Sequence, residues 1–212
     1  PELITMFERS YQQMLKQMEE TSLRGKVVAE TYINAWFFMH NHLSALPKDS
    51  LYLVIDKYPE TLLMYKHLIE KQRPDLDILY LADSSTRFPL KSECIDVHLD
   101  FFAANEHNFY HDTFLYERLL PYLKKDADLI GTYFYFEHAQ KSMKLLLSQY
   151  PESSEKNFNL HYFREELKNN GFELLYQEDC GCITDSGNNL GFGFHVKGEK
   201  MHLLPYHGKR CR

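Results

Sequence analysis

The first twenty residues carry the pattern of an amphipathic helix. Between Glu2 and Glu20 apolar residues recur at steps of three and four positions, the period of one helix face. The apolar stripe includes Met6, Phe7, Met14, Leu15 and Met18. Such a stripe must cover apolar surface, so we expect a lid over a ligand-binding crevice or pairing with a second copy in a homodimer. The short link through Arg24 and Gly25 favours the lid.

After this helix, short apolar runs alternate with longer amphipathic stretches. Five runs have the length and flanking turn residues of buried strands. They are Val27–Ala29, Leu51–Ile55, Asp77–Leu81, Cys94–Leu99 and Leu129–Phe136. Helices are predicted at Ile33–Leu46, Pro59–Lys71 and Thr113–Leu123. Because strands that alternate with such helices form crossover units, the pattern predicts a doubly wound α/β fold with a mostly parallel sheet.

The last third of the chain changes rhythm. Helices are predicted over Ala139–Gln149 and Leu160–Asn169, and strands over Phe172–Tyr176 and Leu190–Val196. The two strands are joined by a turn-rich link that is short enough for an antiparallel hairpin. The chain should therefore form an N-terminal helix, residues 1–24, and one domain, residues 25–212, with seven strands.

Composition and charge limit the class of partner. Over 212 residues, 44% hydrophobic and 25% charged positions are enough for one sizeable core. The net charge of -6 gives no general attraction to nucleic acid or to anionic lipid. No apolar run approaches the roughly 20 residues that span a bilayer, and no secretory pattern opens the chain. We expect a cytoplasmic domain that binds a small molecule, and Pro1 without a preceding Met suggests a piece of a longer protein.

The thiols and histidines do not form a metal-binding pattern. Four cysteines lie at irregular spacing, so reduced thiols are expected: Cys94, Cys180, Cys182 and Cys211. His107 and His111 are four residues apart, which places both on one face of a helix. Such a pair could bind a metal or move a proton, but no third ligand follows at a metal-binding spacing. No metal is predicted.

From Gly25 to Val196 the order of elements resembles class I S-adenosylmethionine-dependent methyltransferases, which implies a Rossmann-like fold. The run Leu51–Asp56 is similar to the family's second strand, and Ala82–Ser84 is similar to the end of its third. Ile95–Val97 resembles the opening of the fourth strand, and Asn170–Glu173 resembles a late turn into a strand. Each match is short, but their order and spacing agree with the family.

The resemblance implies a set of cofactor-binding residues. Asp56 would accept the ribose hydroxyl protons, as acids at strand ends do in doubly wound folds. Asp83 and Ser84 would approach the adenine amine. The whole implied set for S-adenosylmethionine is Glu30, Tyr32, Asn34, Asp56, Lys57, Asp83 and Ser84. An acid at a helix start is also an ordinary cap, so Asp56 keeps that second interpretation.

The first loop departs from the family pattern. When Glu30 is aligned with the acid of the first strand, Tyr32, Asn34 and Trp36 occupy positions that glycines hold in the family. Glycines allow sharp backbone turns and close approach of the cofactor, whereas aromatic side chains fill the space and rarely take positive φ. We therefore expect weak or absent affinity for S-adenosylmethionine.

Two functions remain open, one enzymatic and one not. In a methyltransferase the ligand pocket would be lined by Trp36, Asp100, Phe101, Asn105, His107 and Tyr110. The alternative is a non-catalytic sensor domain, resembling the effector part of MerR-type transcriptional regulators. A content of 15 Phe, 15 Tyr and one Trp suits a pocket for a flat apolar or cationic ligand.

Overall fold

The structure is a computed structural model of the chain. It describes residues 2–33, 43–83, 87–111, 113–137, 144, 147–148, 151, 156–184 and 200–211. Within these residues no helix is long and apolar enough to cross a membrane.

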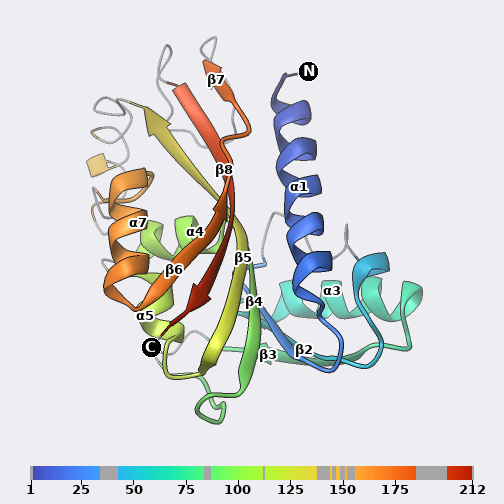
Figure 1. Cartoon of the computed structure of the whole chain (residues 1–212). Helices are drawn as coiled ribbons and strands as arrows, with labels where there is room; N and C mark the ends of the chain where they lie inside the picture. The colour runs from blue at the N-terminus through green and yellow to red at the C-terminus, as the bar shows by residue number, and fades with distance from the viewer. Residues whose placement is uncertain are drawn as a thin grey trace.

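A single mixed sheet organises the domain (Figure 1). Its strands are β1 (Val27–Thr31), β2 (Leu51–Asp56), β3 (Asp77–Ala82), β4 (Ile95–Phe101), β5 (Leu123–Glu137), β6 (Phe172–Gln177), β7 (Cys182–Thr184) and β8 (Lys200–Arg210). The order is β3-β2-β1-β4-β5-β8-β6, and β7 also pairs with β8. The first five strands are parallel, whereas β8 is antiparallel to β5, β6 and β7.

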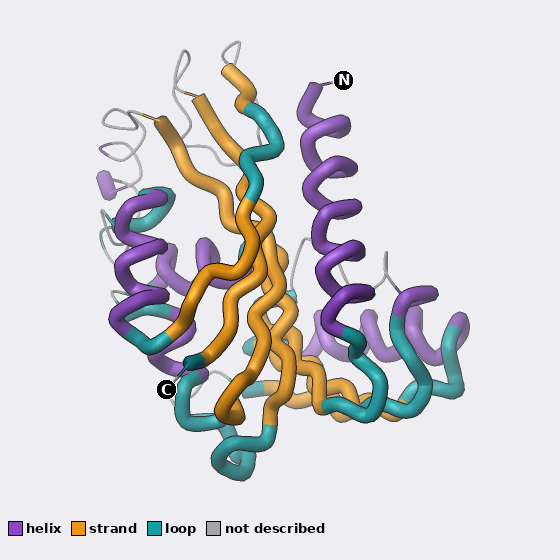
Figure 2. Tube along the Cα trace, viewed as in Figure 1, coloured by secondary structure: helices purple, strands orange, loops and turns teal. Residues whose placement is uncertain are grey.

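Helices cover both faces of this sheet (Figures 1 and 2). On one side lie α1 (Glu2–Thr21) and α3 (Pro59–Gln72), and on the other lie α4 (Ala103–Tyr110), α5 (Leu115–Leu119) and α7 (Leu160–Asn169). A short 3-10 helix, η1, spans Leu43–Ala45. The layered, mostly parallel α/β architecture predicted from the sequence is confirmed.

Sequence patterns predicted the ends of some helices correctly. Helix α3 begins at Pro59, where the missing N–H of proline has no helical partner to lose. Helix α7 has the predicted bounds, and the side chain of Asn159 caps it by accepting a hydrogen bond from the Tyr162 amide at 3.0 Å.

Other elements were predicted wrongly or fall outside the described part. Residues 113–123 do not form one helix: α5 ends at Leu119, and β5 begins at Leu123, earlier than predicted. The last strand is Lys200–Arg210, and the predicted strand at 190–196 lies outside the described residues, as do most of the predicted helices at 33–46 and 139–149. The sheet pairing of β8, not its own hydrophobic pattern, identifies it as the last strand.

Helix α1 packs along β5 and β8 (Figure 1). Met14 and Met18 of its apolar stripe are buried, and Ser10 Oγ lies 2.7 Å from Thr132 Oγ1 in β5. Phe7 makes an edge contact with Phe102, which follows β4. The apolar stripe of α1 therefore packs against the domain of the same chain. The lid and the homodimer both stay predictions.

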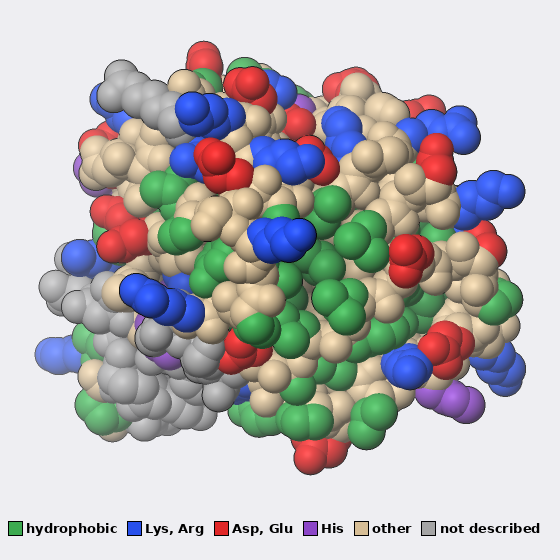
Figure 3. Space-filling view, turned by 90° about the horizontal axis from the view of Figure 1, so that it is seen from below, with side chains coloured by type: hydrophobic (Ala, Val, Ile, Leu, Met, Phe, Trp, Pro, Cys, Tyr) green, Lys and Arg blue, Asp and Glu red, His purple; other side chains and the backbone are tan. Residues whose placement is uncertain are grey.

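The core has one apolar layer on each face of the sheet. The large exposed apolar side chains concentrate at β3 and α3, where Leu79 is 50% and Leu63 is 67% exposed. Hydrophobic side chains also gather on the face seen from below (Figure 3). The edge at β3 is thus less covered than the centre of the sheet.

Candidate functional site

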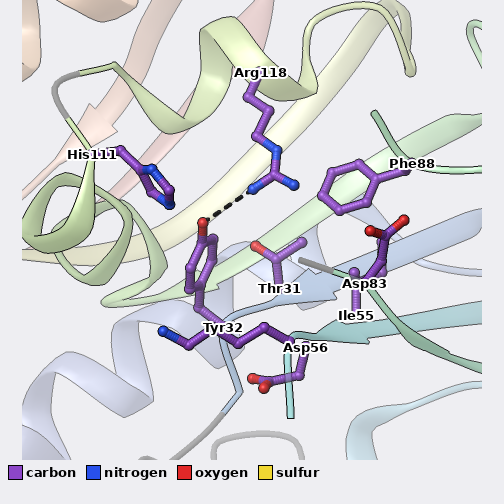
Figure 4. Close-up of a pocket in the computed structure, with 9 residues that line it drawn as sticks. Thr31, Tyr32, Ile55, Asp56, Asp83, Phe88, His111 and Arg118 are labelled. Carbon is purple, nitrogen blue, oxygen red and sulfur yellow. Dashed lines mark hydrogen bonds between the residues drawn. The ribbon is translucent and has the colours of Figure 1, made fainter. Parts of the chain in front are cut away.

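A cavity lies at the carboxyl ends of β1 and β2 (Figure 4). It has a volume of about 170 Å³ and is lined by Thr31, Tyr32, Ile55, Asp56, Lys57, Asp83, Phe88, His111 and Arg118. In open α/β sheets the carboxyl ends of the strands form the usual ligand-binding crevice. The cavity is smaller than the roughly 300–1,000 Å³ of typical ligand pockets.

The two predicted acids border this cavity. Strands β2 and β3 run parallel in register, and the Asp83 amide donates to the Asp56 carbonyl oxygen at 3.0 Å. The Asp56 carboxylate accepts a hydrogen bond from the Tyr58 amide at 2.9 Å, at the start of α3. Asp83 is half-buried, whereas Asp56 is only 4% exposed, so the expectation that both acids are partly exposed was wrong for Asp56. Burial of Asp56 follows from its place at the end of a central strand.

Tyr32 occupies the first glycine-like position directly after β1. Its φ is 54°, in the left-handed region that bulky residues rarely adopt. Its amide donates to the Ile55 carbonyl oxygen at 3.2 Å, which continues the β1–β2 pairing by one residue. The backbone therefore turns as a glycine would, but with an aromatic ring attached.

Hydrogen bonds hold the Tyr32 ring in place. Arg118 Nη1 donates to the Tyr32 hydroxyl oxygen at 3.2 Å, and that hydroxyl lies 2.6 Å from His107 Nδ1. His107 Nε2 lies 3.1 Å from Thr113 Oγ1. These distances fit a chain in which Arg118 donates to Tyr32, Tyr32 donates to His107, and His107 donates to Thr113. Tyr32 is thereby fixed between two elements that follow β4.

In this hydrogen-bonded series only Arg118 is charged near pH 7. Burial raises the pKa of Tyr32 to about 12, with the charge of Arg118 acting in the opposite direction. Burial also lowers the pKa of His107 to about 3, aided by His111 and Arg118. Both side chains are neutral near pH 7, so neither an ionised nucleophile nor a strong base arises from this pair.

The rings of His107 and His111 lie with centroids 4.6 Å apart and planes tilted by 31°. Burial lowers the pKa of His111, and the charges of Arg118 and Lys57 lower it further. Within the described residues no group of three His, Cys, Asp or Glu side chains is arranged to hold a metal ion. The three cysteines whose side chains are described, Cys94, Cys180 and Cys211, are free thiols.

Asp100 was predicted to face the pocket, but it is completely buried elsewhere. Its carboxylate caps α4 by accepting from the Ala103 and Ala104 amides, at 2.5 and 3.2 Å. It also accepts from the hydroxyls of Tyr116 and Tyr206, at 3.0 and 2.7 Å. Four donors surround this carboxylate, so its role is to join β4, α4, α5 and β8.

Other predicted pocket residues are also structural. Asn105 is buried and exchanges two hydrogen bonds with the Phe134 backbone, at 2.9 and 3.0 Å. Phe101 is half-buried and packs on Phe7 of α1 with centroids 6.3 Å apart. Glu30, predicted as a cofactor-binding residue, is 2% exposed within β1 and does not line the cavity. The contacts of Asn105 and Phe101 connect separate elements, which sequence spacing did not reveal.

Several predicted site residues lie outside the described part of the chain. They are Asn34, Trp36 and Ser84, together with the side chain of Tyr110. Conversely, Thr31, Ile55, Phe88 and Arg118 line the cavity although they were not predicted as site residues. Arg118 stands in a short charged helical segment, where a surface arginine is the usual interpretation, so no local signal distinguished it.

No protein-family model and no curated protein matches this sequence. The structure, however, resembles solved structures. A protein of Bacillus halodurans, described provisionally as a methyltransferase, is 12% identical with a TM-score of 0.66, and the match covers 94% of this chain and 99% of that one.

Two further structures contain S-adenosylhomocysteine. Geranyl diphosphate C-methyltransferase of Streptomyces coelicolor is 9% identical with a TM-score of 0.64, covering 93% of this chain and 75% of that one. A phosphoethanolamine N-methyltransferase of Haemonchus contortus is 12% identical with a TM-score of 0.63, covering 95% and 52%.

Together, the strand order and these likenesses define the class of fold. The chain has the Rossmann-like fold of class I S-adenosylmethionine-dependent methyltransferases. At this low identity the likeness establishes the architecture, while the bound ligand belongs to the other proteins. The three structures described above give no support to the MerR-type regulator considered from the sequence.

Proposed function

We infer that this chain is a methyltransferase-like, ligand-binding domain in which affinity for S-adenosylmethionine is weakened or lost. The observation that carries this inference is Tyr32, which follows β1 at φ 54° and lines the cavity at the strand ends. In methyltransferases of this fold the corresponding loop is expected to carry glycine, so that the cofactor approaches the backbone.

The fixed position of Tyr32 supports the inference. Its hydroxyl bonds with His107 and Arg118, so swinging the ring away breaks two hydrogen bonds. Each buried hydrogen bond contributes about 1 kcal/mol, and about 1.4 kcal/mol is already a tenfold change in affinity. Displacing Tyr32 would therefore reduce cofactor affinity by one to two orders of magnitude, roughly.

Asp56 and Asp83 support a retained ligand site. They lie on neighbouring strand ends beside the cavity, where such acids bind ribose and adenine groups in doubly wound folds. The domain would thus hold a small ligand in the crevice without a tightly bound methyl donor.

Calorimetric titration with S-adenosylmethionine and S-adenosylhomocysteine tests the proposal. The wild-type chain should give no binding up to about 1 mM, and Tyr32→Gly should bind at least about tenfold more tightly. Tyr32→Phe is the matched control, since it removes the hydroxyl but keeps the ring, and it should gain less. Micromolar binding by the wild-type chain, or an unchanged affinity in Tyr32→Gly, would contradict the proposal.

A further inference from the structure

Arg118 reaches the cavity from α5, on the opposite side from Asp56 (Figure 4). Its guanidinium carbon lies 4.5 Å from the centroid of the Phe88 ring, a cation–π contact. Nη1 donates to the Tyr32 hydroxyl at 3.2 Å. These two contacts hold the guanidinium plane in one orientation at the cavity wall.

The other two guanidinium nitrogens are not satisfied. Nε and Nη2 of Arg118 are inaccessible to solvent and have no hydrogen-bond acceptor in the described part of the structure. A buried donor left without an acceptor costs about 1–3 kcal/mol, and more when the group is charged. Arginine keeps its charge in proteins, so the group cannot avoid this cost by losing a proton.

The neutral partners of Arg118 do not balance its charge. Its hydrogen-bond acceptor, Tyr32, is neutral because burial raises the pKa of Tyr32 to about 12. Among the described residues no carboxylate oxygen accepts a hydrogen bond from Nε or Nη2 of Arg118. Lys57 and His111 line the same cavity, and burial, followed by the charges of Arg118 and Lys57, lowers the pKa of His111. The cavity wall thus holds the cationic side chains of Lys57 and Arg118 together with the carboxyl groups of Asp56 and Asp83, but none of these groups is a hydrogen-bond acceptor for Nε or Nη2 of Arg118.

The two unsatisfied donors have the geometry for one kind of ligand group. Nε–H and Nη2–H lie on the same edge of the planar guanidinium and point in parallel directions. Such a fork matches two oxygens of a phosphate or a carboxylate, which accept both hydrogens at once. Because both nitrogens are covered in this structure, a neighbouring group must shift when the anion binds.

We propose that Arg118 forms an anion-binding subsite in this cavity, for a phosphate or carboxylate group on a small ligand. The inference rests on the proposed function only in that the ligand occupies the same crevice. It extends that function by naming the ligand class: a nucleoside-like compound with sugar hydroxyls near Asp56 and an anionic group at Arg118.

Adenosine and adenosine 5′-monophosphate provide a matched pair of probes that differ by one phosphate. Calorimetry on the wild-type chain should show the monophosphate binding at least about tenfold more tightly than adenosine. Arg118→Gln should remove this preference, and Arg118→Lys, which keeps a charge but not the fork, should remove most of it. Arg24→Gln is the control, because Arg24 is an exposed arginine that pairs with Asp49 at 3.3 Å.

Competition by inorganic phosphate and by acetate identifies the anionic group. The subsite prefers the anionic group, phosphate or carboxylate, of the ion that displaces the nucleotide at the lower concentration. Thermal unfolding of each variant shows whether its loss of binding reflects unfolding, and Arg118→Lys then serves as the decisive variant. Three results would overturn the proposal: equal affinity for adenosine and its monophosphate, no binding of the monophosphate, or a preference for the monophosphate that is unchanged in Arg118→Lys and Arg118→Gln.

The outcomes separate this proposal from the function proposed above. Adenosine binding without a phosphate preference removes the anion subsite but leaves the ligand-binding crevice in place. A phosphate preference that depends on Arg118, together with micromolar binding of S-adenosylmethionine, keeps the subsite and refutes the weakened cofactor affinity.

Discussion

The hydroxyl oxygen of Tyr32 lies 2.6 Å from Nδ1 of His107, although the two residues are 75 positions apart. The rings also meet edge to face, with centroids 5.6 Å apart. This contact joins the loop after β1 to the helix after β4, at the carboxyl ends of the strands, where open α/β sheets form their ligand-binding crevice. It makes Tyr32 part of the packed structure of the domain.

Removing the hydroxyl should therefore destabilise the folded chain. Tyr32→Phe leaves His107 Nδ1 without its donor and Arg118 Nη1 without its acceptor, and we expect a loss of about 1–3 kcal/mol in the free energy of unfolding. Urea denaturation measures this change. Tyr58→Phe is the control, because the Tyr58 side chain is 45% exposed, and it should change the free energy by less than about 0.5 kcal/mol. Equal effects of both substitutions would show that the hydrogen-bonded chain contributes nothing.

Two buried groups should act on stability in opposite directions as the pH falls. Burial raises the pKa of Asp100 to about 6. The folded state therefore binds a proton more readily than the unfolded chain, and the stability from this group is present at low pH and lost as the pH rises through about 6. Between pH 7 and pH 5 we expect Asp100 to add about 1 kcal/mol. Asp100→Asn should abolish this contribution, as measured by the difference between wild-type and variant unfolding curves.

His98 provides the opposite case and an internal control. Burial lowers the pKa of His98 to about 3, and its Nε2 lies 3.0 Å from Thr31 Oγ1. The unfolded chain takes up the proton first, so stability from this group is present at neutral pH and lost as the pH falls below about 6.5. His98→Gln should remove a loss of about 2 kcal/mol between pH 7 and pH 5. Difference curves with the same sign for both variants would refute the assigned shifts.

Gly131 is required by close approach rather than by an unusual backbone angle. A Cβ atom there would lie 2.5 Å from the Asp100 carbonyl oxygen and 2.8 Å from the Tyr206 hydroxyl. Gly131→Ala should cost at least about 2 kcal/mol, because neither neighbour can move without disturbing the Asp100 cluster. Gly208→Ala is the matched control in the adjacent strand, where the nearest atom is at 3.6 Å. Gly208→Ala should leave the unfolding midpoint in guanidinium chloride nearly unchanged, and an equal effect of the two would contradict the steric argument.

The sequence alone was sufficient for the class of fold and for part of the site. Short apolar runs bounded by turn residues and the period-3.6 pattern reflect burial of each element, which is a local property. They predicted β1 to β4, α3 and α7, and with them the strand ends that carry Asp56 and Asp83. The replacement of glycine by Tyr32 was also visible in the sequence, because chain order alone aligns that position.

Only the tertiary structure decided which distant residues meet. Strand β8 inserts between β5 and β6, and this antiparallel pairing depends on contacts that no window along the chain contains. Asp100 was expected to face a ligand, but it is buried and accepts a hydrogen bond from Tyr206, which is 106 positions away. Arg118 reaches the cavity because the fold brings α5 within 3.2 Å of Tyr32, 86 positions earlier. Hydrophobic patterning determines which face of an element is buried, whereas the identity of its neighbours follows from the packing of the whole chain.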